Sequence, residues 1–132
     1  MKKLNLTEKD KQFIDKIESY KDDKEKIKAC QRYINYLNRE ILMLNQKIEE
    51  YDLHLDEIFD KIKIYTKIDT DEGIEKYNQT LTLYIETEHQ KFVYEKHKDE
   101  NKKKIELIER KIEKAKKHLN KKSLFKHKKS TN

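Results

Sequence analysis

Residues 27–65 read IKACQRYINYLNREILMLNQKIEEYDLHLDEIFDKIKIY. Starting at Ile27 and moving along the segment in alternating steps of three and four residues, each position reached has an apolar or aromatic side chain. This spacing puts the side chains on one face of a helix, which is the pattern of a coiled coil. The segment therefore predicts one long helix with a partner helix along this stripe. The stripe consists of Ile27, Cys30, Ile34, Leu37, Ile41, Leu44, Ile48, Tyr51, Leu55, Ile58, Ile62 and Tyr65.

The composition favours long helices throughout the chain. Charged residues make up 44% of it, and there is one glycine and no proline, so little interrupts a helix. Residues 67–73, KIDTDEG, combine the only glycine with several cap-forming side chains, and they predict a turn. We therefore predict an all-α fold: a long antiparallel helical hairpin of coiled-coil type, preceded by a short helix, with helices at about 8–20, 23–66 and 70–120.

The sequence predicts a single helical domain over residues 1–122 and a basic tail over residues 123–132, which we expect to be disordered. Cys30 is the only cysteine, and its place in the stripe indicates a small buried hydrophobe rather than a reactive thiol. No apolar segment follows Met1-Lys2-Lys3, and no apolar run has the length of a bilayer span. A cytoplasmic protein without a membrane span is the expectation.

One half of the stripe lacks a cover in the predicted hairpin. A turn centred near residue 69 places the polar residues 101–104 opposite Ile34 and Leu37. Each large apolar side chain left exposed forfeits roughly 1.5–3 kcal/mol relative to burial. Three elements could cover this half: the helix at 13–20, a second copy of the protein, or a protein partner.

We predict self-association, with a dimer favoured and its orientation open. The predicted interface with a second copy or a partner comprises Ile27, Tyr33, Ile34, Tyr36, Leu37, Ile41, Leu42 and Leu44. Aromatic residues near this half of the stripe support it, because tyrosine is enriched where proteins meet. On this interpretation, the double change Leu37→Asp and Ile41→Asp breaks the dimer and leaves the distal hairpin helical.

Positive charge gathers at the C-terminus. Residues 96–132 contain 15 basic and 5 acidic side chains. This segment predicts a site for nucleic acid, anionic lipid or an acidic protein patch, or else a soluble helix end that binds nothing. With 29 lysines and 3 arginines among 32 basic residues, base-specific reading of DNA is not expected. The candidate polyanion-binding residues are Lys114, Lys116, Lys117, Lys121, Lys122, Lys126, Lys128 and Lys129.

No catalytic, cofactor or metal motif stands out. Glu86 and His89 have the Glu-x-x-His spacing of di-iron bundles, but no second pair accompanies them, so we expect no metal site. One glycine cannot form a Gly-rich phosphate loop, and we expect neither a cofactor nor an enzyme. The sequence predicts a non-enzymatic protein-protein interaction module, an adaptor, scaffold or inhibitor, with sequence-nonspecific nucleic-acid binding as the alternative. The excess of Lys, Ile, Asn and Tyr is typical of AT-rich genomes, such as those of phages and mobile elements of low-GC bacteria.

Overall fold

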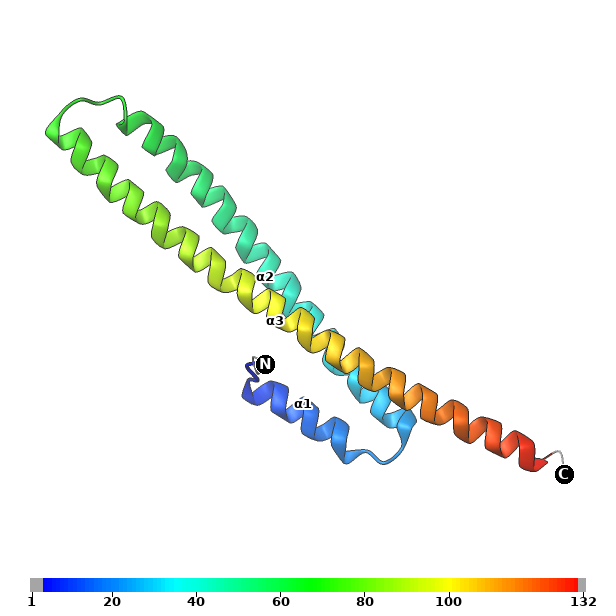
Figure 1. The fold of residues 1–132 in the computed structure, drawn as a ribbon. Coiled ribbons are helices and arrows are strands. Elements are labelled where there is room, and N and C mark those ends of the chain that lie inside the picture. The colour runs from blue at the N-terminus through cyan, green and yellow to red at the C-terminus, as the bar shows by residue number, and fades with distance from the viewer. Residues whose placement is uncertain (1–3, 131–132) are drawn as a thin grey trace. The chain divides into compact units, whose positions relative to one another are not determined.

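The structure is a computed structural model that describes the backbone of residues 4–130 and the side chains of residues 4–122. This part of the chain forms three α-helices and no strand: α1 (Glu8–Ser19), α2 (Asp23–Tyr65) and α3 (Asp71–Ser130) (Figure 1). The all-α helical hairpin is confirmed. The backbone of α3 continues to Ser130 instead of ending near residue 120, because no Gly or Pro follows Gly73. The side chains of the tail predicted at 123–132 lie outside the described residues.

Local capping explains where α1 and α2 begin. The Thr7 hydroxyl accepts a hydrogen bond from the Asp10 backbone N–H at 3.1 Å, and the Thr7 N–H donates to Asp10 Oδ2 at 2.9 Å. These reciprocal bonds form a capping box, which satisfies backbone donors that have no partner inside the helix. Asp22 precedes α2, and its carboxylate accepts from the Lys24 N–H at 3.2 Å.

Thr70 caps the start of α3. Its hydroxyl accepts a hydrogen bond from the Gly73 N–H at 3.1 Å. Gly73 lies in the first turn of α3 without a positive φ, so its role is steric. A Cβ at Gly73 would lie 2.5 Å from Ile68 Cγ2 and 2.9 Å from the Ile68 carbonyl oxygen. The lack of a side chain at Gly73 therefore allows the loop to pack closely against the start of α3.

The chain forms two compact units. The bundle unit comprises Met1–Glu40 and Glu100–Asn132, and the hairpin unit comprises Ile41–Asp99. Their formal charges are opposite: the bundle unit has 24 basic and 12 acidic residues, whereas the hairpin unit has 8 basic and 14 acidic residues. The net charge of +6 is thus the sum of +12 on the bundle unit and −6 on the hairpin unit.

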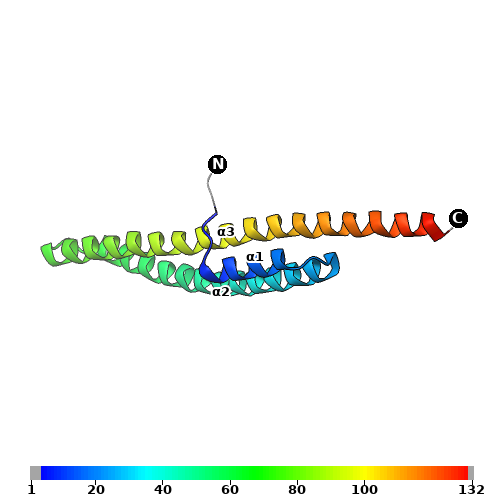
Figure 2. The same ribbon diagram turned by 90° about the horizontal axis from the view of Figure 1, so that it is seen from below.

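In the bundle unit, α1 runs antiparallel to the first part of α2 (Figure 1), and α1, α2 and α3 lie alongside one another (Figure 2). The core contains side chains from all three helices. Phe13 and Ile14 of α1 pack on it as half-buried residues. The buried members are Ile17, Ala29, Cys30, Tyr33, Leu37, Ile108 and Ile112.

In the hairpin unit, the observed pairing of α2 with α3 is displaced from the predicted one. Phe59 contacts Tyr84, and Asp52 pairs with Lys91, so α3 is shifted by five residues, somewhat more than one helical turn. The shift also changes what Leu37 faces in the bundle unit. Leu37 was predicted to face a polar run of α3, but it shares the core with Ile108. The predicted register was wrong although the predicted ends of the two helices at the turn lie within one residue of the observed ends, so the position of the loop does not by itself decide which residues of α2 and α3 face each other.

Candidate functional site

The predicted interface residues do not form one exposed surface. Within the bundle unit, Tyr33 and Leu37 have no exposed area, and Ile27, Ile34 and Tyr36 are half-buried against the core. Within the hairpin unit, Leu44 is buried, Ile41 is half-buried, and Leu42 is 59% exposed. Self-association itself stays a prediction, but most of the surface proposed for it packs inside the chain.

Helix α1 covers the Ile34–Leu37 part of the stripe together with α3, whose Ile108 and Ile112 lie in the same core. The Phe13 ring stacks on the Tyr33 ring at 5.0 Å between centroids, and it lies 5.1 Å from the Tyr36 ring. Lys9 Nζ of α1 lies 4.9 Å from the ring centroid of Tyr36 of α2. Of the three candidates for covering this half, the N-terminal helix is the one the structure supplies.

A buried polar cluster joins the three helices of the bundle unit. Lys104 Nζ donates to Asp10 Oδ2 at 2.8 Å, and the Tyr33 hydroxyl donates to Asp10 Oδ1 at 2.8 Å. Lys104 also lies 3.5 Å from Asn101 Oδ1, and Asn101 Nδ2 donates to Glu40 at 3.2 Å. Asp10, Tyr33, Asn101 and Lys104 are all buried. Because every charge is paired, the cluster fixes the position of α1.

The cluster shifts the titration of its members. Burial alone would raise the pKa of Asp10, but hydrogen bonds from Lys104, the Thr7 N–H and Tyr33 lower that pKa below the ordinary 3.8. Burial, reinforced by the hydrogen bond to Asp10, raises the pKa of Tyr33. Burial and a hydrogen bond with Glu40 raise the pKa of Tyr36 to about 12. Tyr33 and Tyr36 therefore stay neutral and Asp10 stays ionised at neutral pH.

We predict that acid destabilises the bundle unit through Asp10. Because the folded-state pKa of Asp10 is lower than 3.8, its carboxylate stabilises the fold above about pH 4, and this contribution disappears as the pH falls through the folded pKa. Thermal unfolding followed by circular dichroism between pH 7 and pH 2 should show the melting temperature falling most steeply below pH 4. Asp10→Asn should flatten that dependence, and an unchanged slope in this variant would contradict the assignment.

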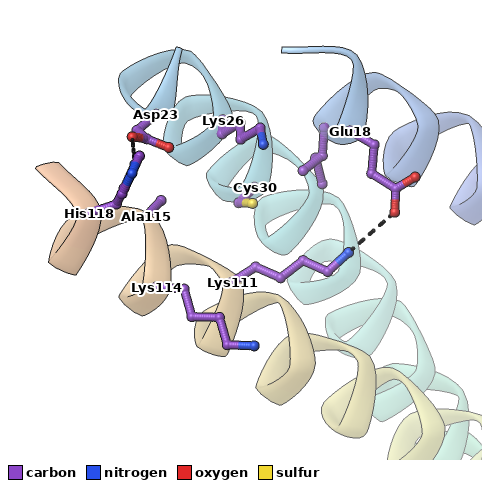
Figure 3. Close-up of a pocket in the computed structure, with 9 residues that line it drawn as sticks. Glu18, Asp23, Lys26, Cys30, Lys111, Lys114, Ala115 and His118 are labelled. Atoms are coloured by element: carbon purple, nitrogen blue, oxygen red, sulfur yellow. Dashed lines mark hydrogen bonds and ion pairs between the residues drawn. The ribbon is translucent and has the colours of Figure 1, made fainter. Parts of the chain in front are cut away.

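Further ion pairs join α1 and α2 to α3 around a pocket of about 350 Å³ (Figure 3). His118 Nδ1 lies 2.6 Å from Asp23 Oδ2, and Lys111 lies 3.8 Å from Glu18. The hydrogen bond with His118 lowers the pKa of Asp23. Cys30 lines the pocket from α2, and burial raises the pKa of its thiol. A protonated, buried thiol is the state expected of a packing residue.

The exposed apolar side chains concentrate in the hairpin unit. Among described side chains of the bundle unit, only Leu6 and Leu107 are large, apolar and exposed. The hairpin unit exposes Leu42, Met43, Leu53, Phe59, Ile64, Ile68, Ile74, Leu83, Ile85, Phe92 and Val93. Its own core is thin: Leu44, Leu55 and Ile58 are its buried apolar residues. The hairpin unit is therefore the part of the chain with the most apolar surface to offer a partner.

Three of these exposed side chains share one face of α3 with the half-buried Leu81. Ile74, Leu81, Ile85 and Phe92 follow each other at steps of seven, four and seven residues, so they form one line, here called the Ile85 face. Ile74, Ile85 and Phe92 are 53–60% exposed, and Leu81 is half-buried. Phe92 also lines a groove of about 230 Å³ with Leu55 and Tyr84, so the Ile85 face continues toward α2.

The predicted polyanion-binding lysines differ in their surroundings. Lys114, Lys116, Lys117 and Lys121 are exposed, whereas Lys122 lies 3.5 Å from Asp23. The side chains of Lys126, Lys128 and Lys129 lie outside the described residues. The sequence alone could not show which of these lysines are paired, because the acid that pairs with Lys122 is on another helix.

Glu86 and His89 are both exposed on α3. Among the described side chains, no three His, Cys, Asp or Glu residues cluster as metal ligands would. In the same part of the chain, no helix combines the length and the apolarity needed to cross a bilayer. No protein-family model, curated protein or solved structure matches this chain.

Proposed function

We propose that the protein is a non-enzymatic protein-interaction module, a scaffold or adaptor, that associates with a second copy of itself through the Ile85 face of the hairpin unit. The observation behind this proposal is the unpartnered apolar line on α3. Its exposed members sit in an otherwise charged chain, in which 44% of residues are charged. Apolar surface of this kind, in a defined line with polar flanks, is typical of interfaces between proteins.

The order of side chains along the Ile85 face supports a second copy as the occupant. The face is symmetric about position 83: Ile74 and Phe92 lie nine residues from it, and Leu81 and Ile85 lie two residues from it. In an antiparallel pair related by a two-fold axis at this position, Ile74 meets Phe92 and Leu81 meets Ile85. A two-fold interface must be self-complementary in this way. The flanking positions Asn78 and Glu88 also exchange, so no like charges face each other there.

The size of the face suits a weak dimer. Residues 74–92 span about 27 Å of helix, and one helix is about 10 Å wide, so a pair would bury roughly 500 Å² in total, below the size of a stable interface. Burying the half-exposed side chains of the Ile85 face in both copies contributes roughly 1 kcal/mol for each side chain. Association entropy costs about 4–15 kcal/mol. We therefore expect a dimer whose population depends on protein concentration.

We predict that Ile85→Glu combined with Phe92→Glu yields a monomer of 16.2 kDa. Light scattering coupled to size exclusion over a series of concentrations should show the wild-type mass rising above that of the monomer and this variant staying monomeric, because two buried carboxylates per chain would be unpaired. Met43→Glu with Leu53→Glu is the matched control, since both side chains are 66% exposed on α2. The control should show the same rise in mass as the wild type. A wild type that stays monomeric over the whole series would contradict the proposal.

Cross-linking tests the antiparallel orientation. In a Cys30→Ala background, chains carrying only Ile74→Cys are mixed with chains carrying only Phe92→Cys under oxidising conditions. The mixture should form a disulfide-linked heterodimer, and neither chain should link to itself, because equivalent positions lie about 27 Å apart along the helix. Self-linked homodimers in place of the heterodimer would indicate a parallel pair.

A further inference from the structure

The cations of α3 in the bundle unit occupy two different faces. The first face carries the cations Lys104, Lys111 and Lys122, with His118 in the same line, and all four side chains contact acids of α1 or α2. The second face carries the cationic stripe, which consists of Lys103, Arg110, Lys114, Lys117 and Lys121, at steps of seven, four, three and four residues. Position on the helix therefore separates cations that hold the fold together from cations that do not.

All five side chains of the cationic stripe are exposed, and within the described residues none has an ion-pair partner. The acids of this part of α3, Glu106, Glu109 and Glu113, form a line beside the stripe, because Glu106 and Glu113 lie three or four positions from Lys103, Arg110 and Lys117. The stripe thus presents a row of cations over 18 residues, about 27 Å of helix, with an acidic line along one side. The net charge of +12 on the bundle unit strengthens the positive field around it.

We infer that the cationic stripe binds the phosphate backbone of duplex nucleic acid without reading its sequence. This binding goes beyond the proposed self-association, which uses other residues. A straight row of cations can neutralise several phosphates and release their counterions, which is the main source of nonspecific affinity. Four of the five cations are lysines, and lysine lacks the forked geometry that reads guanine.

The composition of α3 around the stripe argues against other polyanions. Residues 100–122 contain no Phe, Tyr or Trp, so bases of a single strand would find no aromatic ring on which to stack. A helix that lies in a membrane interface needs a broad apolar face beside its cations. Leu107 is the one exposed large apolar side chain in the described part of this segment. Duplex phosphate is the ligand whose chemistry the stripe matches best.

The test uses the full-length protein, a fluorescein-labelled 20-base-pair duplex and fluorescence anisotropy at several salt concentrations. The variant Lys103→Gln/Arg110→Gln/Lys117→Gln should bind at least tenfold more weakly near 0.1 M salt. Each lost phosphate contact lowers the slope of log K against log salt by about 0.9, so the slope should decrease by about two to three. Duplexes of different sequence should bind the wild type within about threefold of one another.

The matched control is Lys61→Gln/Lys63→Gln/Lys67→Gln, which removes the same charge from exposed lysines of the hairpin unit. It should bind within twofold of the wild type. Circular dichroism should show both variants folded, because the substituted side chains are exposed. Three results would overturn the inference: no salt-dependent binding by the wild type, equal losses in both variants, or tighter binding to phosphatidylserine vesicles than to the duplex. Dissociation of a dimer by the stripe variant alone would assign the stripe to self-association instead.

Discussion

Lys104→Met is expected to lower the free energy of unfolding of the bundle unit by about 3–5 kcal/mol, because it leaves the buried Asp10 carboxylate without its cation. Lys104 and Asp10 are 2.8 Å apart, and their side chains are 4% and 2% exposed. The methionine fills similar space, so the loss comes from the missing charge rather than from a cavity. Urea unfolding followed by circular dichroism, with hydrogen exchange of α1 amides as a local probe, would measure it.

Lys103→Met is the matched control, since Lys103 is the exposed neighbour of Lys104 on the same helix. It should change stability by no more than about 0.5 kcal/mol. A second variant, Asp10→Asn with Lys104→Met, should recover part of the loss, because neutral groups replace an unpaired buried charge. Equal effects of Lys103→Met and Lys104→Met would show that the buried ion pair contributes nothing to the fold.

The helices could be predicted from the sequence because their signals are local. The stripe from Ile27 to Tyr65, the Thr7 and Asp22 caps and the turn before Gly73 each depend on residues a few positions apart. The register could not be predicted in the same way. A shift of α3 along α2 by about one turn changes every pair of residues that face each other. It decides whether Leu37 packs against Ile108 or faces a polar run.

The buried charges were missed for a related reason. Asp10 looks like an ordinary first-turn acid, and Lys104 stands in a run of lysines, yet the two meet across 94 positions of the chain. Charged side chains are almost never fully buried unless paired, and pairing over that distance leaves no local pattern. The cationic stripe is different: the seven-residue spacing of Lys103, Arg110 and Lys117 is visible in the sequence. It is found only when lysines are sorted by helical face rather than counted along the chain.

Sorting apolar residues by helical face also changes where an interaction surface is expected. The sequence left three candidates to cover the Ile27–Leu37 part of the stripe, and α1 covers it through Phe13 and Ile17, together with Ile108 of α3. On α3, Ile85 and Phe92 lie on a face of their own, whereas Tyr84 contacts Phe59 of α2. Counting apolar residues along α3 cannot separate the residues that contact α2 from those that are exposed, because both kinds occur in the same apolar segment.

Leu37→Asp is therefore expected to unfold the bundle unit, rather than only to separate two copies of the protein. Leu37 has no exposed area and packs in the core with Tyr33 and Ile108. Truncating a buried leucine alone costs about 2–5 kcal/mol. An unpaired carboxylate in the same place adds a desolvation cost, and an effect above about 5 kcal/mol exceeds the stability of many small domains. Hydrogen exchange should show α1 amides losing protection while amides of residues 41–99 keep theirs.

Leu42→Asp is the matched control, because Leu42 was predicted to share the interface but is 59% exposed. It should leave α1 protected and change stability by no more than about 0.5 kcal/mol. The two interpretations of Leu37 predict opposite results for the folded fraction. If Leu37→Asp gave a monomer with α1 still protected, Leu37 would be an interface residue and the packing of α1 over it would be wrong. If α1 loses protection, the apolar stripe of α2 at Leu37 serves the fold and is not the surface for self-association.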